Sequence, residues 1–197
     1  MSDYRALKTA QGLTLLELMI VLAIVAVLIT LAIPSLARLL QSNSRSSTLN
    51  TFLADMGYAR SEAIRRGGGV VLCRSDFPEA INPVCSSTSA ASNHGWASGW
   101  IVFHDLDANG FKDMADPLLR VQAPITSMDA ILEKDTGVSS LFRFTGSGRL
   151  FDLASATTLI FGGASYGVDA QRVVCVNLGG RVRIAGDGST DCGADNV

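Results

Sequence analysis

The spacing of apolar positions changes twice along the chain, and each change marks a different structural element. Residues 18–37 carry no charged side chain, and about 20 such residues are enough for a helix to cross a bilayer. From residue 36 to residue 64 the apolar residues recur every three or four positions, as on one face of a helix. Three glycines, residues 67–69, then predict its end. The pattern therefore predicts one helix over residues 14–66, about 80 Å long at about 1.5 Å per residue.

After the glycines the apolar residues alternate with polar ones, a period of two that is typical of β-strands. Gly, Ser, Asn and Asp separate the runs, which suits turns between antiparallel strands. The expected strands cover residues 70–73, 100–103, 118–121, 141–144, 158–161, 172–178 and 181–185. We therefore expect an α+β fold, with a long N-terminal helix packed on an antiparallel β-sheet domain.

One carboxylate, Glu17, lies at the start of the apolar segment. An unpaired carboxylate in hydrocarbon costs about 3 kcal/mol on insertion scales, so it needs a partner. Cleavage after Gly12 would supply one, because it creates an N-terminal amine at Leu13. An ordinary signal peptide has a shorter apolar core and is cut on its far side. The pattern therefore favours a short polar leader that is removed before the apolar segment.

These residues resemble the N-terminal segment of the type IV pilin-like proteins. In that family a prepilin peptidase cleaves after a glycine and the new N-terminus is methylated. A glutamate at the fifth mature position then helps to dock the subunit onto a filament. The resemblance assigns cleavage and N-methylation to Gly12 and Leu13, and filament assembly to Glu17. Leu13 departs from the phenylalanine that the family usually has there.

The resemblance also implies a domain organisation and a location. Residues 1–12 would be the leader, residues 13–37 the transmembrane or filament-core half of the helix, and residues 38–66 its amphipathic half. Residues 67–197 would form the globular β domain, with a C-terminal hairpin and tail. The implied location is a single pass of the inner membrane with the globular domain in the periplasm, and outside the cell once the subunit is in a pilus.

Four cysteines, all beyond the helix, indicate disulfides in an exported domain. They are Cys73, Cys85, Cys175 and Cys192. An even number in an oxidising environment predicts two disulfides. Three pairings are possible, of which Cys73 with Cys85 and Cys175 with Cys192 close the shortest loops. Zinc is disfavoured, because there is no C-x-x-C pair and neither histidine has ligand spacing to a cysteine.

The net charge is only −2, but the charges are unevenly distributed. Residues 38–74 hold six arginines against two acids, whereas residues 76–135 hold nine acids against three bases. A basic surface is therefore compatible with an acidic chain.

Catalysis has little support in the sequence. The chain has two histidines and no G-x-S-x-G, P-loop or H-E-x-x-H motif, and the cysteines are better explained as disulfides. We therefore expect neither an enzyme nor a cofactor.

The segment from Arg172 to Ala185 is typical of a β-hairpin, because Gly179-Gly180 between two β-type runs suits a turn with positive φ. Arg181 and Arg183 are two positions apart, so on a strand they share a face about 7 Å apart. That is near the phosphate spacing of one DNA strand, and the planar guanidinium suits phosphate. Taken alone, the residues favour a simpler interpretation, in which the arginines keep an exposed strand soluble.

The sequence Gly180-Arg181-Val182-Arg183 is similar to a G-R-x-R motif of the FimT-like minor pilins, a group related to the type II secretion pseudopilin GspH. FimT-like proteins bind DNA and help take it up in natural transformation. The resemblance implies DNA contacts by Arg181 and Arg183, with Arg172 as a further candidate. Its implied partners are DNA, other pilins or pseudopilins, prepilin peptidase and the inner membrane. The alternatives are a GspH-like pseudopilin of type II secretion and a pilus-assembly pilin that does not bind DNA.

An acidic segment follows the second expected strand and has the spacing of a calcium loop. Its candidate oxygen ligands are Asp105, Asp107, Asn109, Asp113 and Asp116. The last is Asp where the EF-hand pattern has a bidentate Glu, and no helices flank the loop. An acidic β-turn is the favoured interpretation, with calcium as the alternative.

Trp96 and Trp100 lie beside a β-type run. Exposed tryptophans stack on the bases of single-stranded DNA, whereas tryptophans next to strands more often belong to the core. The core interpretation is favoured.

Overall fold

The computed structural model describes residues 14–86, 94–134, 141–151, 153, 155–163 and 166–193. The chain divides into two compact units, residues 1–41 and residues 42–197. One helix, α1 (Leu15–Arg66), includes residues of both units. The proposed cleavage residues Gly12 and Leu13 lie outside the described residues.

The start of α1 is fixed by a side-chain cap. The hydroxyl of Thr14 accepts the backbone N–H of Glu17 at 3.2 Å, which satisfies one of the unpaired donors of the first turn. Glu17 therefore lies in the first turn, where the partial positive charge of the helix N-terminus favours a carboxylate. The sequence pattern Thr14-x-x-Glu17 is that of a capping box.

The first unit contains the apolar half of α1. Its described large apolar side chains, from Leu15 to Leu40, are all exposed, from 41% at Val25 to 76% at Leu15. The sequence predicts a membrane span here. Within the described residues, however, no helix is both long enough and apolar enough to cross a membrane.

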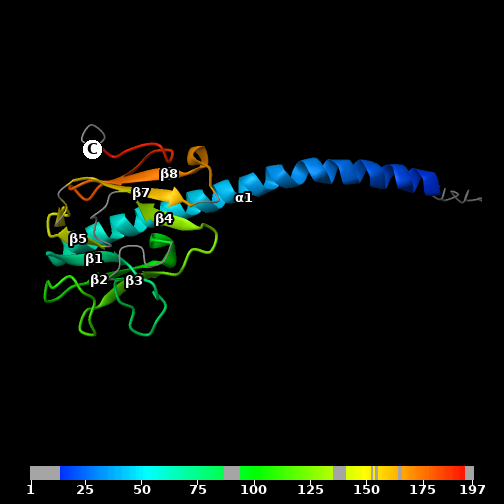
Figure 1. Ribbon diagram of the computed structural model, residues 1–197. Coiled ribbons are helices and arrows are strands. Elements are labelled where there is room, and N and C mark those ends of the chain that lie inside the picture. The colour runs from blue at the N-terminus through cyan, green and yellow to red at the C-terminus, as the bar shows by residue number, and fades with distance from the viewer. Residues whose placement is uncertain are drawn as a thin grey trace, which may run out of the picture. The chain divides into compact units, whose positions relative to one another are not determined.

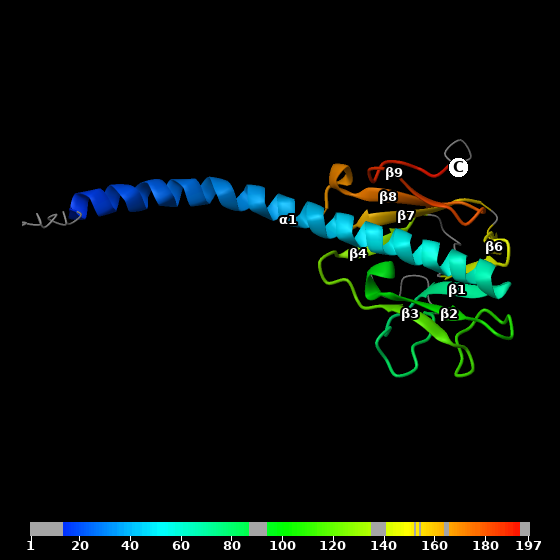
Figure 2. The same ribbon diagram turned by 180° about the vertical axis from the view of Figure 1, so that it is seen from behind.

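The described part of the second unit contains two antiparallel sheets (Figures 1 and 2). The strand order is β3-β2-β1-β5-β6 in the first sheet and β4-β7-β8-β9 in the second. The strands are β1 (Gly68–Arg74), β2 (Trp100–His104), β3 (Leu118–Gln122), β4 (Ala130–Glu133), β5 (Leu141–Thr145), β6 (Leu150–Phe151), β7 (Thr157–Gly162), β8 (Arg172–Val176) and β9 (Val182–Gly186). Two short 3-10 helices, η1 (Trp96–Ser98) and η2 (Val168–Ala170), complete the described elements.

The second half of α1 lies between the two sheets. Figures 1 and 2 both show β7 and β8 on one side of this part of the helix, with β1 and β2 on the other. Phe52 is fully buried and makes edge-to-face contacts with Trp96, with Trp100 of β2 and with Phe161 of β7. The rings lie 5.4–5.7 Å apart, the range of favourable aromatic pairs. One helical side chain thus joins both sheets in a single core.

A buried carboxylate fixes the rotation of α1 against the first sheet. Asp55 accepts the indole N–H of Trp100 at 2.8 Å and forms a salt bridge with Arg120 of β3 at 2.6 Å. The guanidinium of Arg120 also lies 4.1 Å from the centre of the Tyr58 ring. These contacts satisfy a charge that would otherwise be costly to bury.

The α+β prediction is confirmed, with two differences of detail. The expected strands are all present, but the structure adds β4 and β6, and it divides the strands between two sheets, which the sequence did not predict. Trp96 and Trp100 are fully buried, so the core interpretation is confirmed and base stacking by these tryptophans is wrong. Their indole N–H groups donate to Glu133 and Asp55.

The central position of Phe52 gives a first prediction. Phe52→Ala should lower the free energy of unfolding by about 3–5 kcal/mol, because it opens a cavity between the two sheets. Asn50→Ala is a matched control on the exposed side of the same helix, and it should change stability by no more than about 0.5 kcal/mol. Thermal or urea unfolding measures both, and equal effects of the two substitutions would contradict the central role of Phe52.

Candidate nucleic-acid interface

The arginine hairpin is built on a turn that depends on Gly180. The Gly180 N–H donates to the Asn177 carbonyl at 2.9 Å, and the Asn177 N–H donates to the Arg181 carbonyl at 3.0 Å. Gly180 has a φ of 70°. These features define a three-residue loop, Leu178–Gly180, that ends in a glycine bulge. The sequence suggested a two-residue turn at Gly179-Gly180, and the extra residue changes which strand residues face each other.

The turn is anchored to the neighbouring β5–β6 turn. A Cβ atom on Gly180 would collide with the carbonyl oxygen of Gly148, so the close approach of the two backbones requires glycine as well as the positive φ does. The Leu150 N–H of β6 donates to the Leu178 carbonyl at 2.9 Å. The hairpin end is therefore held by backbone contacts with the other sheet.

Arg181 and Arg183 project from the outer face at the edge of the second sheet. Both are exposed, and β9 is the last strand of its sheet. Arg183 lies opposite Cys175 of β8, so the two side chains share a face. Arg181 is two positions earlier and leaves the same face. The described part of the chain gives neither guanidinium a hydrogen-bond or ion-pair partner.

A disulfide fastens the C-terminal tail over this same outer face. Cys175 is bonded to Cys192, and the pair is buried with Val173. Cys73 of β1 is bonded to Cys85. Of the three pairings that the sequence allows, the structure forms the one with the shortest loops. The tail therefore lies against β8, next to the strand that carries the arginines.

Arg172 is not brought together with the other two arginines. It shares its strand face with Val174 and Val176, which belong to the core between the sheets. Its guanidinium donates to the carbonyls of Asp169 and Gln171, at 2.9 and 2.7 Å. Burial and, secondly, the charge of Arg172 lower the pKa of Arg45 on α1. Arg172 is thus engaged locally and faces the helix side of the sheet.

The fold adds an arginine that the sequence did not suggest. Arg149 is exposed and lies between Gly148, which touches Gly180, and Leu150, which is bonded to Leu178. The described residues offer its side chain no bonded partner. Arg149 belongs to a different hairpin, about 30 residues earlier, so only the contact between the two turns reveals it.

Most of the arginines between residues 38 and 74 whose side chains the structure describes are engaged within the protein. Arg45 donates to the Ala170 carbonyl, and the buried Arg74 donates to the Ser86 hydroxyl at 3.2 Å. The cluster of positive charge that the sequence places in residues 38–74 is therefore not one continuous basic surface.

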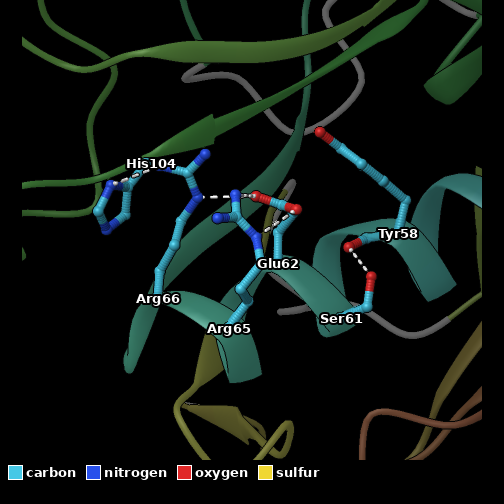
Figure 3. A network of polar contacts seen from close by, with 6 residues as sticks. All are labelled: Tyr58, Ser61, Glu62, Arg65, Arg66 and His104. Carbon is cyan, nitrogen blue, oxygen red and sulfur yellow. Dashed lines mark hydrogen bonds and ion pairs between the residues drawn. The ribbon is translucent and has the colours of Figure 1, made fainter.

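At the end of α1, one glutamate holds two arginines (Figure 3). Glu62 accepts from Arg65 at 2.5 Å and from Arg66 at 2.8 Å, while Arg66 also reaches Nδ1 of His104 at 3.4 Å. The hydrogen bonds from Arg65 and then Arg66 lower the pKa of Glu62 to about 2. This network ties the helix end to β2, and it leaves these arginines paired.

The acidic loop between β2 and β3 brings together only part of the predicted ligand set. One carboxylate oxygen each from Asp105, Asp107 and Asp116 lies within 4.8 Å of the others. Asp105 and Asp116 are buried, whereas Asp107 is exposed. Burial raises the pKa of Asp105; the hydrogen bond from the Gly110 N–H opposes this, and the neighbouring carboxylates of Asp107 and Asp116 add to it.

The other two predicted ligands shape the loop instead. Asn109 Oδ1 accepts the Phe111 N–H at 2.6 Å, and Asp113 Oδ1 accepts the N–H groups of Ala115 and Asp116 at 2.7 and 3.2 Å. These are Asx-type turn contacts. The acidic turn is therefore present, and three of its carboxylates also converge.

The fold and the N-terminal segment together define a class of protein. A long helix with an exposed apolar first half carries two antiparallel sheets on its second half, and a polar leader with Gly12 precedes it in the sequence. These are the features of a type IV pilin-like subunit.

Comparison with known families identifies the group within that class. Residues 48–180 match the family described as Type II transport protein GspH, and residues 7–33 match the Prokaryotic N-terminal methylation motif. The chain belongs to the GspH family. Membership implies processing by prepilin peptidase, assembly with other pilin-like subunits, and a membrane-anchored subunit before assembly. A comparison with curated proteins returned no match.

A solved structure supports the fold. The type IV minor pilin FimU of Pseudomonas aeruginosa, crystallised in space group P21, superposes with a TM-score of 0.53 at 20% identity. The match covers 75% of this chain and 92% of FimU. A second FimU crystal form, P65, gives a TM-score of 0.49 at 20% identity, covering 74% and 94% of the two chains.

The Glu62 network predicts a specific response to acid. Because the folded pKa lies below its ordinary value near 4.5, the pairing stabilises the protein above that value and is lost as the pH falls towards about 2. Between pH 5 and pH 2, the melting temperature of the Glu62→Gln variant should therefore fall less than that of wild type. Glu79→Gln, at an exposed glutamate outside the network, should follow wild type. Parallel pH curves for all three proteins would contradict the prediction.

Removal of the Cys175–Cys192 disulfide should lower the stability of the protein. Cys175 and Cys192 are 17 residues apart, and closing a loop of about 15 residues is worth about 3 kcal/mol in the chain-entropy model. The Cys175→Ser/Cys192→Ser variant should thus melt roughly 6–12 °C lower than wild type, as for a domain of about 150–250 residues. Differential scanning calorimetry without reductant measures this. An unchanged melting temperature would show that the tail is held by its other contacts.

Proposed function

We propose that this chain is a minor type IV pilin that binds extracellular DNA for uptake in natural transformation. Arg181 and Arg183 are the proposed contacts, and Arg149 extends their surface. Before assembly the subunit is held at the inner membrane by its N-terminal helix, with the globular part in the periplasm. Incorporation into a pilus then exposes the arginines outside the cell.

The observation that carries the proposal is the pair of exposed, unpaired arginines on one face of an edge strand, judged over the described residues. Arginines that serve only solubility need no fixed geometry. Here the glycine bulge, the contact with the β5–β6 turn and the Cys175–Cys192 disulfide all restrain the strand that bears them. A restrained strand loses less conformational entropy when it binds a phosphate backbone.

The chemistry of this surface limits the kind of recognition. Arginine side chains on a strand edge reach phosphates without entering a groove, so they carry no base-specific information. Their affinity comes largely from the release of counterions. Binding should therefore be weak for each subunit, independent of base sequence and strongly reduced by salt. Several subunits or a long DNA molecule would raise the overall affinity through multivalency.

The filament part of the proposal rests on α1. The exposed apolar side chains from Leu15 to Leu40 form an apolar surface of the kind that marks a lipid or protein contact. We assign Glu17 to subunit docking and Gly12 and Leu13 to processing, following the methylation motif. In the described residues the Glu17 carboxylate has no bonded partner, which suits a partner supplied by another subunit.

DNA binding is testable with the full-length chain in non-ionic detergent micelles. Fluorescence anisotropy with a short duplex should show binding at 50 mM salt and much weaker binding at 200 mM. If two phosphates are neutralised, the slope of log K against log salt is about −2. Arg181→Ala/Arg183→Ala should abolish the salt-dependent binding, and Arg149→Ala should weaken it.

A matched control variant distinguishes a specific DNA site at β9 from a general effect of positive charge. Arg65→Ala/Lys112→Ala removes the same two positive charges from the helix end and the acidic loop, and should bind nearly as wild type does. Circular dichroism and melting temperature check that each variant is folded. Equal losses in both double variants would argue against a site at β9.

The outcome also bears on the other function that the comparisons favour. The match to the GspH family supports a pseudopilin of type II secretion as the second candidate. No binding by wild type at 50 mM salt would refute the DNA proposal and leave assembly with other pseudopilins as the function.

A further inference from the structure

The acidic loop holds one buried carboxylate oxygen that its own hydrogen bonds do not satisfy. Both oxygens of Asp107 and both of Asp116 accept hydrogen bonds from within the loop. Asp105 is 4% exposed, and its Oδ2 accepts the Gly110 N–H at 2.8 Å. Its Oδ1 is buried and has no hydrogen-bond partner among the residues that the structure describes. A buried carboxylate oxygen without a donor is costly, because neither water nor protein compensates its lost hydration. This oxygen belongs to the residue that is grouped with Asp107 and Asp116.

Within the described residues, no salt bridge compensates the three negative charges. The salt bridges found among the described residues involve none of Asp105, Asp107 and Asp116. The cationic side chains that reach the loop donate to backbone carbonyls instead: Arg143 Nη2 to Ala108 at 3.0 Å, and Lys112 Nζ to Asp113. Like charges this close repel one another, so a cation between the carboxylates would stabilise the arrangement.

The spacing of the oxygens indicates which cation fits. Calcium binds oxygen at about 2.3–2.6 Å, so two oxygens on one calcium ion are at most about 5.2 Å apart. The three carboxylate oxygens all lie within 4.8 Å of one another, which is inside that limit. Magnesium binds oxygen at about 2.0–2.1 Å and demands a near-ideal octahedron of ligands. Calcium also accepts the irregular, partly hydrated coordination that one exposed and two buried carboxylates offer.

We propose that Asp105, Asp107 and Asp116 bind one Ca²⁺ ion, with water and loop carbonyl oxygens completing its coordination. Asp113 lies outside this group of converging carboxylates, and its Oδ1 accepts two backbone N–H groups. The Asn109 amide is used within the loop, because its Nδ2 donates to Asp107 Oδ2 at 2.7 Å and its Oδ1 accepts the Phe111 N–H. The site is independent of the proposed DNA contact and does not depend on it.

Calcium at this position would connect the loop to the helix end. The Asp105 N–H donates to the Gly69 carbonyl at 2.7 Å, directly after the last turn of α1. The Asp116 Oδ1 accepts the Leu106 N–H at 2.9 Å, across the base of the loop. An ion that joins both carboxylates therefore closes the loop at its base and stabilises the junction between α1 and β1.

The test uses the full-length chain in non-ionic detergent after removal of metals with a chelator. Calorimetric titration with CaCl₂ should show one site with a dissociation constant of about 10⁻⁴–10⁻³ M, the range of extracellular calcium modules. At a concentration near 100 times the dissociation constant, calcium should raise the melting temperature by roughly 5–10 °C. Magnesium should bind at least ten times more weakly. No binding up to 10 mM calcium, or equal effects of the two ions, would overturn the proposal.

Two single variants distinguish a specific calcium site from a general effect of negative charge. Asp107→Asn removes an exposed ligand and should weaken calcium binding at least tenfold. Asp113→Asn removes the same charge from the same loop, and should weaken it less than threefold. Equal losses in these two variants would refute the assignment of ligands.

Asp105→Asn probes the buried carboxylate itself. Because it removes a buried charge, the metal-free variant should melt at least as high as metal-free wild type, and calcium should no longer raise its melting temperature. A calcium-induced shift equal to that of wild type would refute the role of Asp105. The metal-free comparison also shows whether the variant is folded.

Discussion

The second half of α1 is the element on which both sheets depend, because its buried face is the apolar surface that they share. Phe52 contacts aromatic rings from each sheet. Two polar contacts then fix the helix about its axis: Asp55 with β2 and β3 on one side, and Arg45 with η2 on the other. The hydrophobic effect is non-directional, whereas a buried polar or charged group must meet its hydrogen-bond partners. The apolar contacts supply stability, and the polar contacts set the register in which the sheets are assembled.

The two proposed binding surfaces lie where turns of the two sheets meet the end of this helix. The backbone at Gly180 packs closely against the carbonyl of Gly148. A Cβ atom on Gly148 would contact Arg60 and Ile64 of α1. The acidic loop is bonded to Gly69, just after the helix ends. Glycines make these approaches possible, since any larger residue would separate the backbones. The same end of the helix therefore supports both the arginine hairpin and the acidic loop.

Local periodicity was enough to predict the helix, the main strands and the fold class, because each depends on residues close in sequence. Strand β6 has only two residues, too few to show a period. Strand β4, with the sequence AILE, has three successive apolar residues and no alternation. The division into two sheets and the hairpin register depend on contacts that spacing does not encode. For the same reason Arg172 was a candidate on sequence grounds although it faces the helix, and Arg149 was missed. The acidic motif was recognised, but only the fold shows that Asn109 and Asp113 serve the turn and that Asp105 is buried.

The tail disulfide has a consequence for the order of events during biogenesis. A bond between Cys175 and Cys192 forms in oxidising surroundings and is kept reduced in the compartment where proteins are made. Until this bond forms, the C-terminal residues are tied to β8 only by non-covalent contacts, and the edge strand beside them is less restrained. On the periplasmic location proposed above, the fully restrained arginine face is therefore a property of the subunit after export, and the oxidation of two thiols distinguishes it from the newly made precursor.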